Sequence, residues 1–207
     1  MEDRRVTRSK ALILDAARAC FAEHGLDDTS VEDVAERAGI AKRTIYNIYG
    51  DKETLFRAAV AVSIDIAERF NADLLEQVKA LRNPATDLPA LAARLARDAL
   101  LGPVVPMRLL VARESHRFPD LAAEYRDRAP EAVIRTISAG LAHLAEVGAL
   151  EIPDAGIAAE QFAFLVLGAE LDRRMFGDAR TSAADVESRA IAGAETFLRA
   201  YASASQR

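Results

Sequence analysis

Residues 29–52 read TSVEDVAERAGIAKRTIYNIYGDK, and this stretch holds two short helical patterns on either side of a glycine. In the first pattern, apolar residues at 31, 34, 35 and 38 follow the i, i+3, i+4, i+7 spacing of one helix face. Ser30 is the expected N-cap, Asp33 its partner in a capping box, and Gly39 the end of the helix. The second helix is expected over residues 42–49. Two short helices joined by a tight turn containing glycine predict a helix-turn-helix.

Helical periodicity continues on both sides of this motif, and no segment alternates as a strand does. One helix is expected to end at His24-Gly25, and a long one to run from near Lys52, capped by Asp51, to about Leu81. Five further helices are expected near residues 87–101, 104–116, 118–148, 154–176 and 182–204. Pro130 should kink or break the third of them. Only the first six to eight residues and the tail from about Ser203 are expected to be disordered. The predicted fold class is all-α, with an N-terminal three-helix domain linked by a long helix to a larger helical domain.

Composition excludes several classes of protein. The 207 residues carry a formal net charge of −5 and are 51% hydrophobic, which is typical of a folded soluble chain. One cysteine and the lack of a secretory signal favour the reducing cytoplasm. The longest stretch without a formal charge, residues 136–145, is too short to span a membrane. The three histidines are scattered, and no zinc-protease, phosphate-loop or serine-elbow motif occurs, so we expect no metal, no cofactor and no enzymatic activity.

Charge in the first 52 residues is polarised. Residues 1–10 sum to +2 and residues 37–52 to +3, whereas residues 11–36 sum to −6. The second motif helix begins Lys42-Arg43-Thr44, with Asn47 one turn on, and Ile45 should face inward. Local cations can meet phosphates even in a weakly acidic protein. The alternative is that Lys42 and Arg43 form only a solvated helix face, because such turns are common in helical proteins.

A set of residues between 12 and 56 carries a resemblance to a known family. It comprises Ile13, Ala16, Ala17, Phe21, Gly25, Thr29-Ser30-Val31, Val34-Ala35, Ala38-Gly39-Ile40, Thr44-Ile45-Tyr46, Tyr49, Lys52-Glu53 and Leu55-Phe56. In this pattern the chain resembles the DNA-binding domain of the tetracycline repressor (TetR/AcrR-like) family. One departure is Ala41, which stands where the family often has Ser or Thr, so the recognition helix is expected to lack a side-chain N-cap.

The resemblance implies eight DNA-binding residues. Phosphate contacts are implied for Thr29, Ser30, Tyr46 and Lys52, and groove contacts for Lys42, Arg43, Thr44 and Asn47. Tyr49 matches a buried aromatic, for which we expect core packing.

The rest of the chain is implied to bind an effector and to dimerise. Residues 113–121 look like those of repressors related to the multidrug-efflux regulators. Effector-pocket candidates are Met107, Arg108, Val111, His116, Phe118, Tyr125, His143, Phe162 and Phe164, most of which are equally well explained as core. The last two helices are unusually apolar, and family members pair them with their twofold mates; the alternative is that these faces pack only within one chain. The dimer-interface candidates are Ile157, Phe162, Leu165, Val166, Ala169, Phe176, Val186, Ala190, Ile191, Ala194, Phe197, Leu198 and Tyr201.

These expectations combine into one functional hypothesis. Residues 1–52 form a helix-turn-helix DNA-binding domain, and residues 53–207 a helical effector-binding and dimerisation domain. The chain is then a homodimeric, ligand-responsive transcriptional regulator of the cytoplasm. It is expected to be a repressor that an unidentified small molecule releases from double-stranded operator DNA. The alternative is a helical small-molecule sensor or scaffold that binds no DNA.

Overall fold

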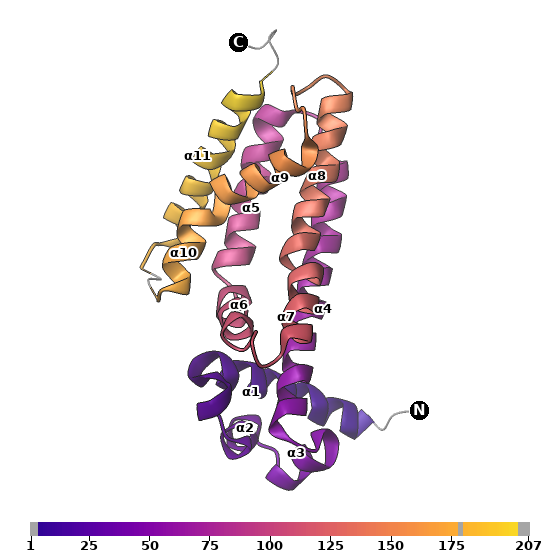
Figure 1. Ribbon diagram of the computed structural model, residues 1–207, viewed down its shortest axis with the longest axis vertical. Helices are drawn as coiled ribbons and strands as arrows, with labels where there is room; N and C mark the ends of the chain where they lie inside the picture. Colours follow the sequence, from indigo (N-terminus) through magenta and orange to yellow (C-terminus); the bar gives the residue numbers. More distant parts are fainter. Residues whose placement is uncertain (1–3, 178–179, 203–207) are drawn as a thin grey trace. The chain divides into compact units, whose positions relative to one another are not determined.

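The computed structural model describes residues 4–177 and 180–202, and within these ranges the regular structure is entirely helical (Figure 1). The helices are α1 (Arg4–Asp28), α2 (Val31–Ala38), α3 (Lys42–Tyr49), α4 (Lys52–Lys79), α5 (Pro84–Leu100), α6 (Val104–Arg113), α7 (Pro119–Arg128), α8 (Pro130–Glu146), α9 (Ala155–Ala163), the π-helical turn η1 (Phe164–Gly168), α10 (Ala169–Met175) and α11 (Ala183–Tyr201). The prediction of an all-α fold is confirmed. Among the residues described, no helix is long and apolar enough to cross a membrane.

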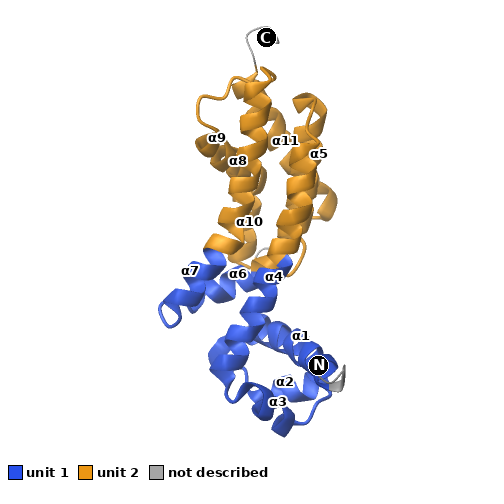
Figure 2. Cartoon of the chain, turned by 90° about the vertical axis from the view of Figure 1, so that its right-hand side faces the viewer, with its two compact units in different colours: residues 1–66, 106–126 blue, residues 67–105, 127–207 orange. Residues whose placement is uncertain are grey.

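The chain divides into two compact units (Figure 2). Unit 1 comprises residues 1–66 and 106–126, and unit 2 comprises residues 67–105 and 127–207. The long helix α4 contributes residues to both units. Unit 1 therefore holds the two-helix motif together with a later segment of the chain, which comprises most of α6 and α7.

Three aromatic rings join the separate segments of unit 1. The Phe56 ring of α4 lies edge-on to Phe21 of α1, with ring centroids 5.5 Å apart, and 5.2 Å from the ring of Phe118. Phe118 lies just before α7 and is also covered by the guanidinium groups of Arg57 and Arg117, 4.9 and 5.3 Å from its centroid. Because all three rings are almost fully buried, this contact attaches the α6–α7 segment to the start of α4.

Ion pairs surround the same ring. Arg57 makes two hydrogen bonds to the Asp120 carboxylate, at 2.7 and 3.2 Å. Arg117 pairs with Asp27 at 3.1 Å and also with Glu53. These pairs are exposed, so each contributes little to stability; they connect the α6–α7 turn to the end of α1 and the start of α4.

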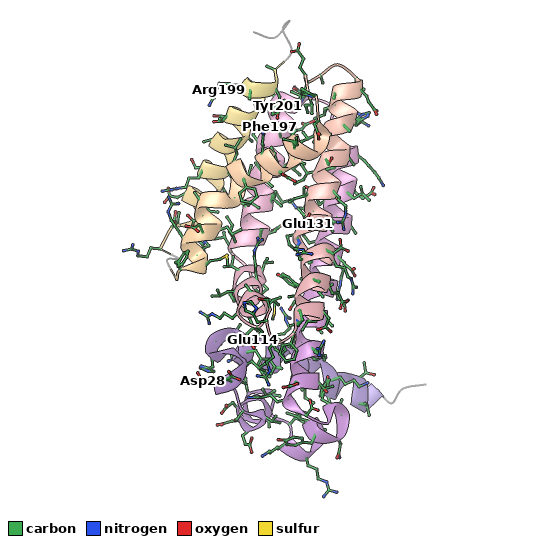
Figure 3. All side chains as sticks on the ribbon, in the orientation of Figure 1. Asp28, Glu114, Glu131, Phe197, Arg199 and Tyr201 are labelled. Carbon is green, nitrogen blue, oxygen red and sulfur yellow. The ribbon has the colours of Figure 1, made fainter. Side chains whose placement is uncertain are left out.

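Unit 2 is built around α5 and α11, which pack along each other (Figure 1). Its core includes Leu88 and Leu95 of α5, Phe162 of α9, and Phe197 of α11, each 1% exposed or less. The Phe162 and Phe197 rings meet edge to face, with their centroids 5.3 Å apart. The centroid of Phe197 lies 4.5 Å from that of Tyr201, which follows one turn later on α11 (Figure 3).

Most expected helix boundaries are confirmed, and the differences have local causes. Pro130 ends one helix and starts another, so the expected helix 118–148 is two, α7 and α8. α5 starts three residues earlier than expected, because the Asn83 side chain accepts from the Ala85 amide and Pro84 occupies the first turn. Within α1, Gly25 breaks the helical backbone with a φ of +84°.

The structure tests the expectation of disorder at only part of the chain ends. Helix α1 begins at Arg4, so the expectation of disorder is wrong for residues 4–8. The expectation of disorder also covers residues 1–3 and the tail from Ser203, and these residues lie outside the described part of the chain. The last two positions of the expected helix 182–204 lie outside it as well.

Candidate nucleic-acid interface

Helix α2 has both of its predicted caps. The Ser30 hydroxyl accepts from the Asp33 amide at 3.1 Å, and the Asp33 carboxylate accepts from the Ser30 amide at 2.8 Å. The Ser30 hydroxyl also donates to the Asp33 carboxylate at 2.7 Å. This hydrogen bond, and after it the one from the Ser30 amide, holds the pKa of Asp33 below its ordinary value. At the other end Gly39 adopts the left-handed conformation, with φ 64° and ψ 31°. The capping box and the glycine cap are therefore confirmed.

Helix α3 has one buried residue, which packs toward the inside of the motif. Ile45 is 1% exposed, and the neighbouring α2 buries Val31, Val34 and Ala35. Packing this apolar side inward leaves Lys42, Arg43, Tyr46 and Asn47 exposed, while Thr44 is half-buried. Ala41 makes no side-chain cap, as expected. The structure therefore brings five of the eight predicted DNA-binding residues together on α3.

The two cations at the start of α3 differ in their surroundings. Lys42 forms an ion pair with Glu32 of α2, and its ammonium lies 5.5 Å from the centroid of the Tyr46 ring. Arg43 is exposed, and no ion pair or hydrogen bond of its side chain occurs within the described part of the chain. Arg43 is thus the cation of this helix that is free for a ligand.

The hydroxyl groups of Thr29 and Ser30 both have partners within the protein. Thr29 is 1% exposed, and its hydroxyl lies 3.1 Å from the Cys20 carbonyl and 2.6 Å from the Gly25 carbonyl. The Ser30 hydroxyl is occupied by the capping box. A buried hydroxyl cannot reach a phosphate without local rearrangement, so this geometry gives the Thr29 side chain a structural role at the end of α1.

Lys52 also has protein partners. Its ammonium donates to the carbonyls of Leu26, Asp27 and Thr29, at 2.8, 3.1 and 3.0 Å. All three N–H groups are therefore used, and they satisfy carbonyls that the end of α1 leaves without helical partners. No local signal in the sequence points to this role, because the three carbonyls lie 23 to 26 residues before Lys52.

Tyr49 differs from Tyr46, although both lie on α3. Tyr46 is 43% exposed, whereas Tyr49 is half-buried with its hydroxyl enclosed and without a hydrogen-bond partner among the described residues. Burial raises the pKa of the Tyr49 phenol. Core packing of Tyr49 agrees with the expectation from the sequence.

The effector-pocket candidates are divided between the two units. Unit 1 holds Met107, Arg108, Val111, His116, Phe118 and Tyr125, and unit 2 holds His143, Phe162 and Phe164. Met107, Val111, Phe118 and Tyr125 are buried, and burial raises the pKa of the Tyr125 phenol. His116 and His143 are exposed, and Phe164 is 69% exposed.

The dimer-interface candidates differ in how deeply they are buried within the single chain. Those buried within the single chain are Phe162, Val166, Val186, Ala190, Ala194 and Phe197. Those at least one third exposed are Ile157, Leu165, Ala169 and Phe176, whereas Ile191, Leu198 and Tyr201 are half-buried. The six buried side chains already fill the core of unit 2 and have little surface left for a partner chain to cover, so their place in the interface stays a prediction.

Sequence-family comparisons match two parts of this chain. Residues 13–59 match the model of bacterial regulatory proteins of the tetR family. Residues 86–203 match the C-terminal domain model of AefR-like transcriptional repressors, which covers more than half of the chain. The first match includes α2, α3 and the start of α4.

Similar individual proteins point in the same direction. The chain is 44% identical over 52 residues to the transcriptional repressor AcnR of Corynebacterium glutamicum, a match that covers 25% of this chain and 28% of the relative. It is 37% identical over 70 residues to the transcriptional regulator YezE of Bacillus subtilis, over 34% of each protein. The chain thus spans about a third or less of the length of these relatives.

Solved structures are similar over nearly the whole length. A protein described as a TetR-family transcriptional regulator of Mesorhizobium loti has a TM-score of 0.86 and 28% identity, over 98% of this chain and 100% of its own. The flavonoid-responsive regulator FrrA has a TM-score of 0.64 and 27% identity, over 96% of this chain and 99% of its own.

Proposed function

Because the chain belongs to the TetR family of bacterial transcriptional regulators, we propose that it is a homodimeric, ligand-responsive repressor that binds operator DNA through α3. In this proposal residues 1–52 bind DNA, residues 53–207 bind the effector and dimerise, and the protein acts in the cytoplasm. The observation that carries DNA binding is the outward face of α3, where Arg43, Tyr46 and Asn47 are exposed above the buried Ile45.

The chemistry of these side chains suits the major groove. A guanidinium can donate two hydrogen bonds to guanine, and an amide can both donate to and accept from adenine. Tyr46 can reach a phosphate with its hydroxyl. We therefore assign base contacts to Arg43 and Asn47, with Thr44 at the side of the same surface, and phosphate contacts to Tyr46 and Lys42.

Dimerisation is supported by large apolar side chains that lie in water in the single chain. Ile157, Leu165 and Phe176 are 53%, 46% and 86% exposed, and Phe164 next to Leu165 is 69% exposed. Exposed apolar groups of this size mark interaction surfaces. A twofold partner on this surface would also supply the second recognition helix that a two-half-site operator needs.

Response to a small molecule would act through unit 1. The buried Met107, Val111 and Tyr125 belong to the α6–α7 segment, which Phe118 joins to α4 beside the DNA-binding helices. A ligand that moves this segment would therefore bias the position of the motif, and DNA and ligand would weaken each other's binding equally. The similar FrrA is named as flavonoid-responsive.

Selection of DNA fragments tests the proposal. The full-length protein is expected to enrich a short palindrome from fragmented genomic DNA of its source organism. Arg43→Ala and Asn47→Ala should each cost about 1–3 kcal/mol of operator binding per half-site and relax base preference at one position. Arg126→Ala is the control, because Arg126 is an exposed arginine of α7 and lies off this surface.

Two results would contradict the proposal. If no sequence is enriched, the chain does not act at an operator, and the sensor or scaffold without DNA binding takes its place. If a palindrome is enriched but Arg43→Ala and Asn47→Ala bind it as tightly as Arg126→Ala does, the recognition surface is not α3.

A further inference from the structure

The first cation of α3 is already neutralised by a residue of α2. The Lys42 ammonium pairs with the Glu32 carboxylate while it lies over the Tyr46 ring. The side chains of Lys42 and Glu32 are 45% and 58% exposed, so both remain accessible to solvent and to a ligand. Exposed ion pairs contribute little to stability, so this pair can be exchanged for another partner at low cost.

The other carboxylates of α2 have different surroundings. Asp33 is engaged in the capping box with Ser30. Glu36 lies one turn beyond Glu32 and is exposed, and its side chain has no ion pair within the described ranges. Arg37, the remaining charged residue of α2, is bound by Glu23 of α1 at 2.7 Å. Glu32 is therefore the carboxylate of α2 that is placed to control a cation of the recognition helix.

We propose that Glu32 is a specificity-determining residue, which competes with DNA phosphates for Lys42. This inference rests on the proposed DNA-binding function and deepens it. Sequence-independent binding comes from cations that neutralise phosphates, so a cation held by an internal carboxylate is withdrawn from that attraction. Arg43 and Asn47 have no such competitor and can still read base edges. Glu32 thus weakens binding to random DNA more than binding to the operator.

Replacing Glu32 by Gln tests this, because glutamine keeps the size of the side chain and removes its charge. Binding of Glu32→Gln to a random-sequence duplex should tighten about threefold to tenfold in low salt, and the salt dependence should steepen by about one phosphate contact per protomer. Binding to the selected operator should tighten less, so the ratio of operator to random affinity should fall.

Two further variants separate Glu32 from a general charge effect. Glu36→Gln makes the same change of charge on the same helix without touching Lys42, and it should leave the ratio of operator to random affinity unchanged. In a Lys42→Gln background, Glu32→Gln should have no effect on either DNA, because the cation it controls is gone. Circular dichroism of each variant checks that α2 and α3 remain folded.

Three outcomes would overturn the inference. Equal tightening by Glu32→Gln and Glu36→Gln would show a general charge effect, and an undiminished effect without Lys42 would show another target. Weaker operator binding by Glu32→Gln would mean that the pair holds Lys42 for the groove instead of withholding it. In all three, operator selection by the unmodified protein stands; failure of the unmodified protein to bind any DNA would refute the proposed function as well.

Discussion

The α2–α3 motif and the C-terminal helices α9–α11 are both rich in apolar residues, but they use them differently. In α2 and α3 the apolar residues occupy one face, and Val34 and Ile45 are at most 1% exposed. In the C-terminal region apolar side chains point both ways: Phe162 and Phe197 are fully buried, whereas Phe164 and Phe176 are 69% and 86% exposed. Helical periodicity separates inside from outside only where a helix has one apolar face.

The largest expected effect is a loss of stability on removing a buried aromatic ring from the C-terminal helices. Phe197→Ala removes a ring that packs against Phe162 and Tyr201, so it should lower the free energy of unfolding by about 3–5 kcal/mol. Phe164→Ala is the comparison, because this ring is mostly in water. It should leave the helical content intact and weaken the proposed dimer.

Two measurements distinguish these variants. Chemical denaturation at a fixed protein concentration reports the loss of stability, and sedimentation equilibrium reports the dimer. If Phe197→Ala proved to be as stable as the unmodified protein but monomeric, its side chain would belong to the interface after all.

A smaller effect is expected where α11 meets the backbone of the π-helical turn. A Cβ added at Gly193 would lie 2.4 Å from the Leu165 carbonyl oxygen, which cannot move as a side chain can. Gly193→Ala should therefore cost about 1–3 kcal/mol of stability, although alanine is normally the better helix former. Gly102→Ala, whose Cβ would meet no atom closer than 3.4 Å, is the control. Equal thermal stability of the two variants would argue against this close approach.

The smallest expected effect concerns the motif. Ser30→Ala removes the cap of α2 and should cost about 1 kcal/mol near neutral pH, whereas Ser30→Thr should retain most of the cap. The folded state lowers the pKa of Asp33. The stability that the Asp33 carboxylate contributes through the capping box is therefore present above the ordinary pKa, near 3.8, and is lost as the pH falls through the lowered pKa.

Urea denaturation at pH 7 and pH 3 measures this dependence. The difference in stability between Ser30→Ala and the unmodified protein should shrink in acid. A difference that is the same at both values of pH would mean that the Asp33 carboxylate is not part of the cap.

Local signals explain how much of the fold could be predicted. The bounds of α2 and α3 agree with the prediction to the residue. Ser30 and Gly39 mark the two ends of α2, and in the structure Gly50 ends α3. Pro130 likewise marks a real helix break. The π-helical turn of residues 164–168 was not predicted, since its sequence continues the helical pattern without a break signal.

The candidate site also has features that follow from local sequence and features that do not. That Lys42, Arg43, Tyr46 and Asn47 share an exposed surface follows from helical spacing once Ile45 is buried. That Lys42 is paired with Glu32, and that Lys52 is bound by three carbonyls, does not follow, because the partners lie on other segments.

The sequence alone determined the helical class, the caps of the motif and the face that α3 turns outward, since each depends on residues within about one helical turn of one another. The tertiary structure decided which aromatic rings of the C-terminal helices are buried and which cation of α3 is free. It also decided that residues 106–126 join the unit of the motif. These outcomes depend on contacts between segments far apart in the chain, where several helices offer competing partners for the same side chain.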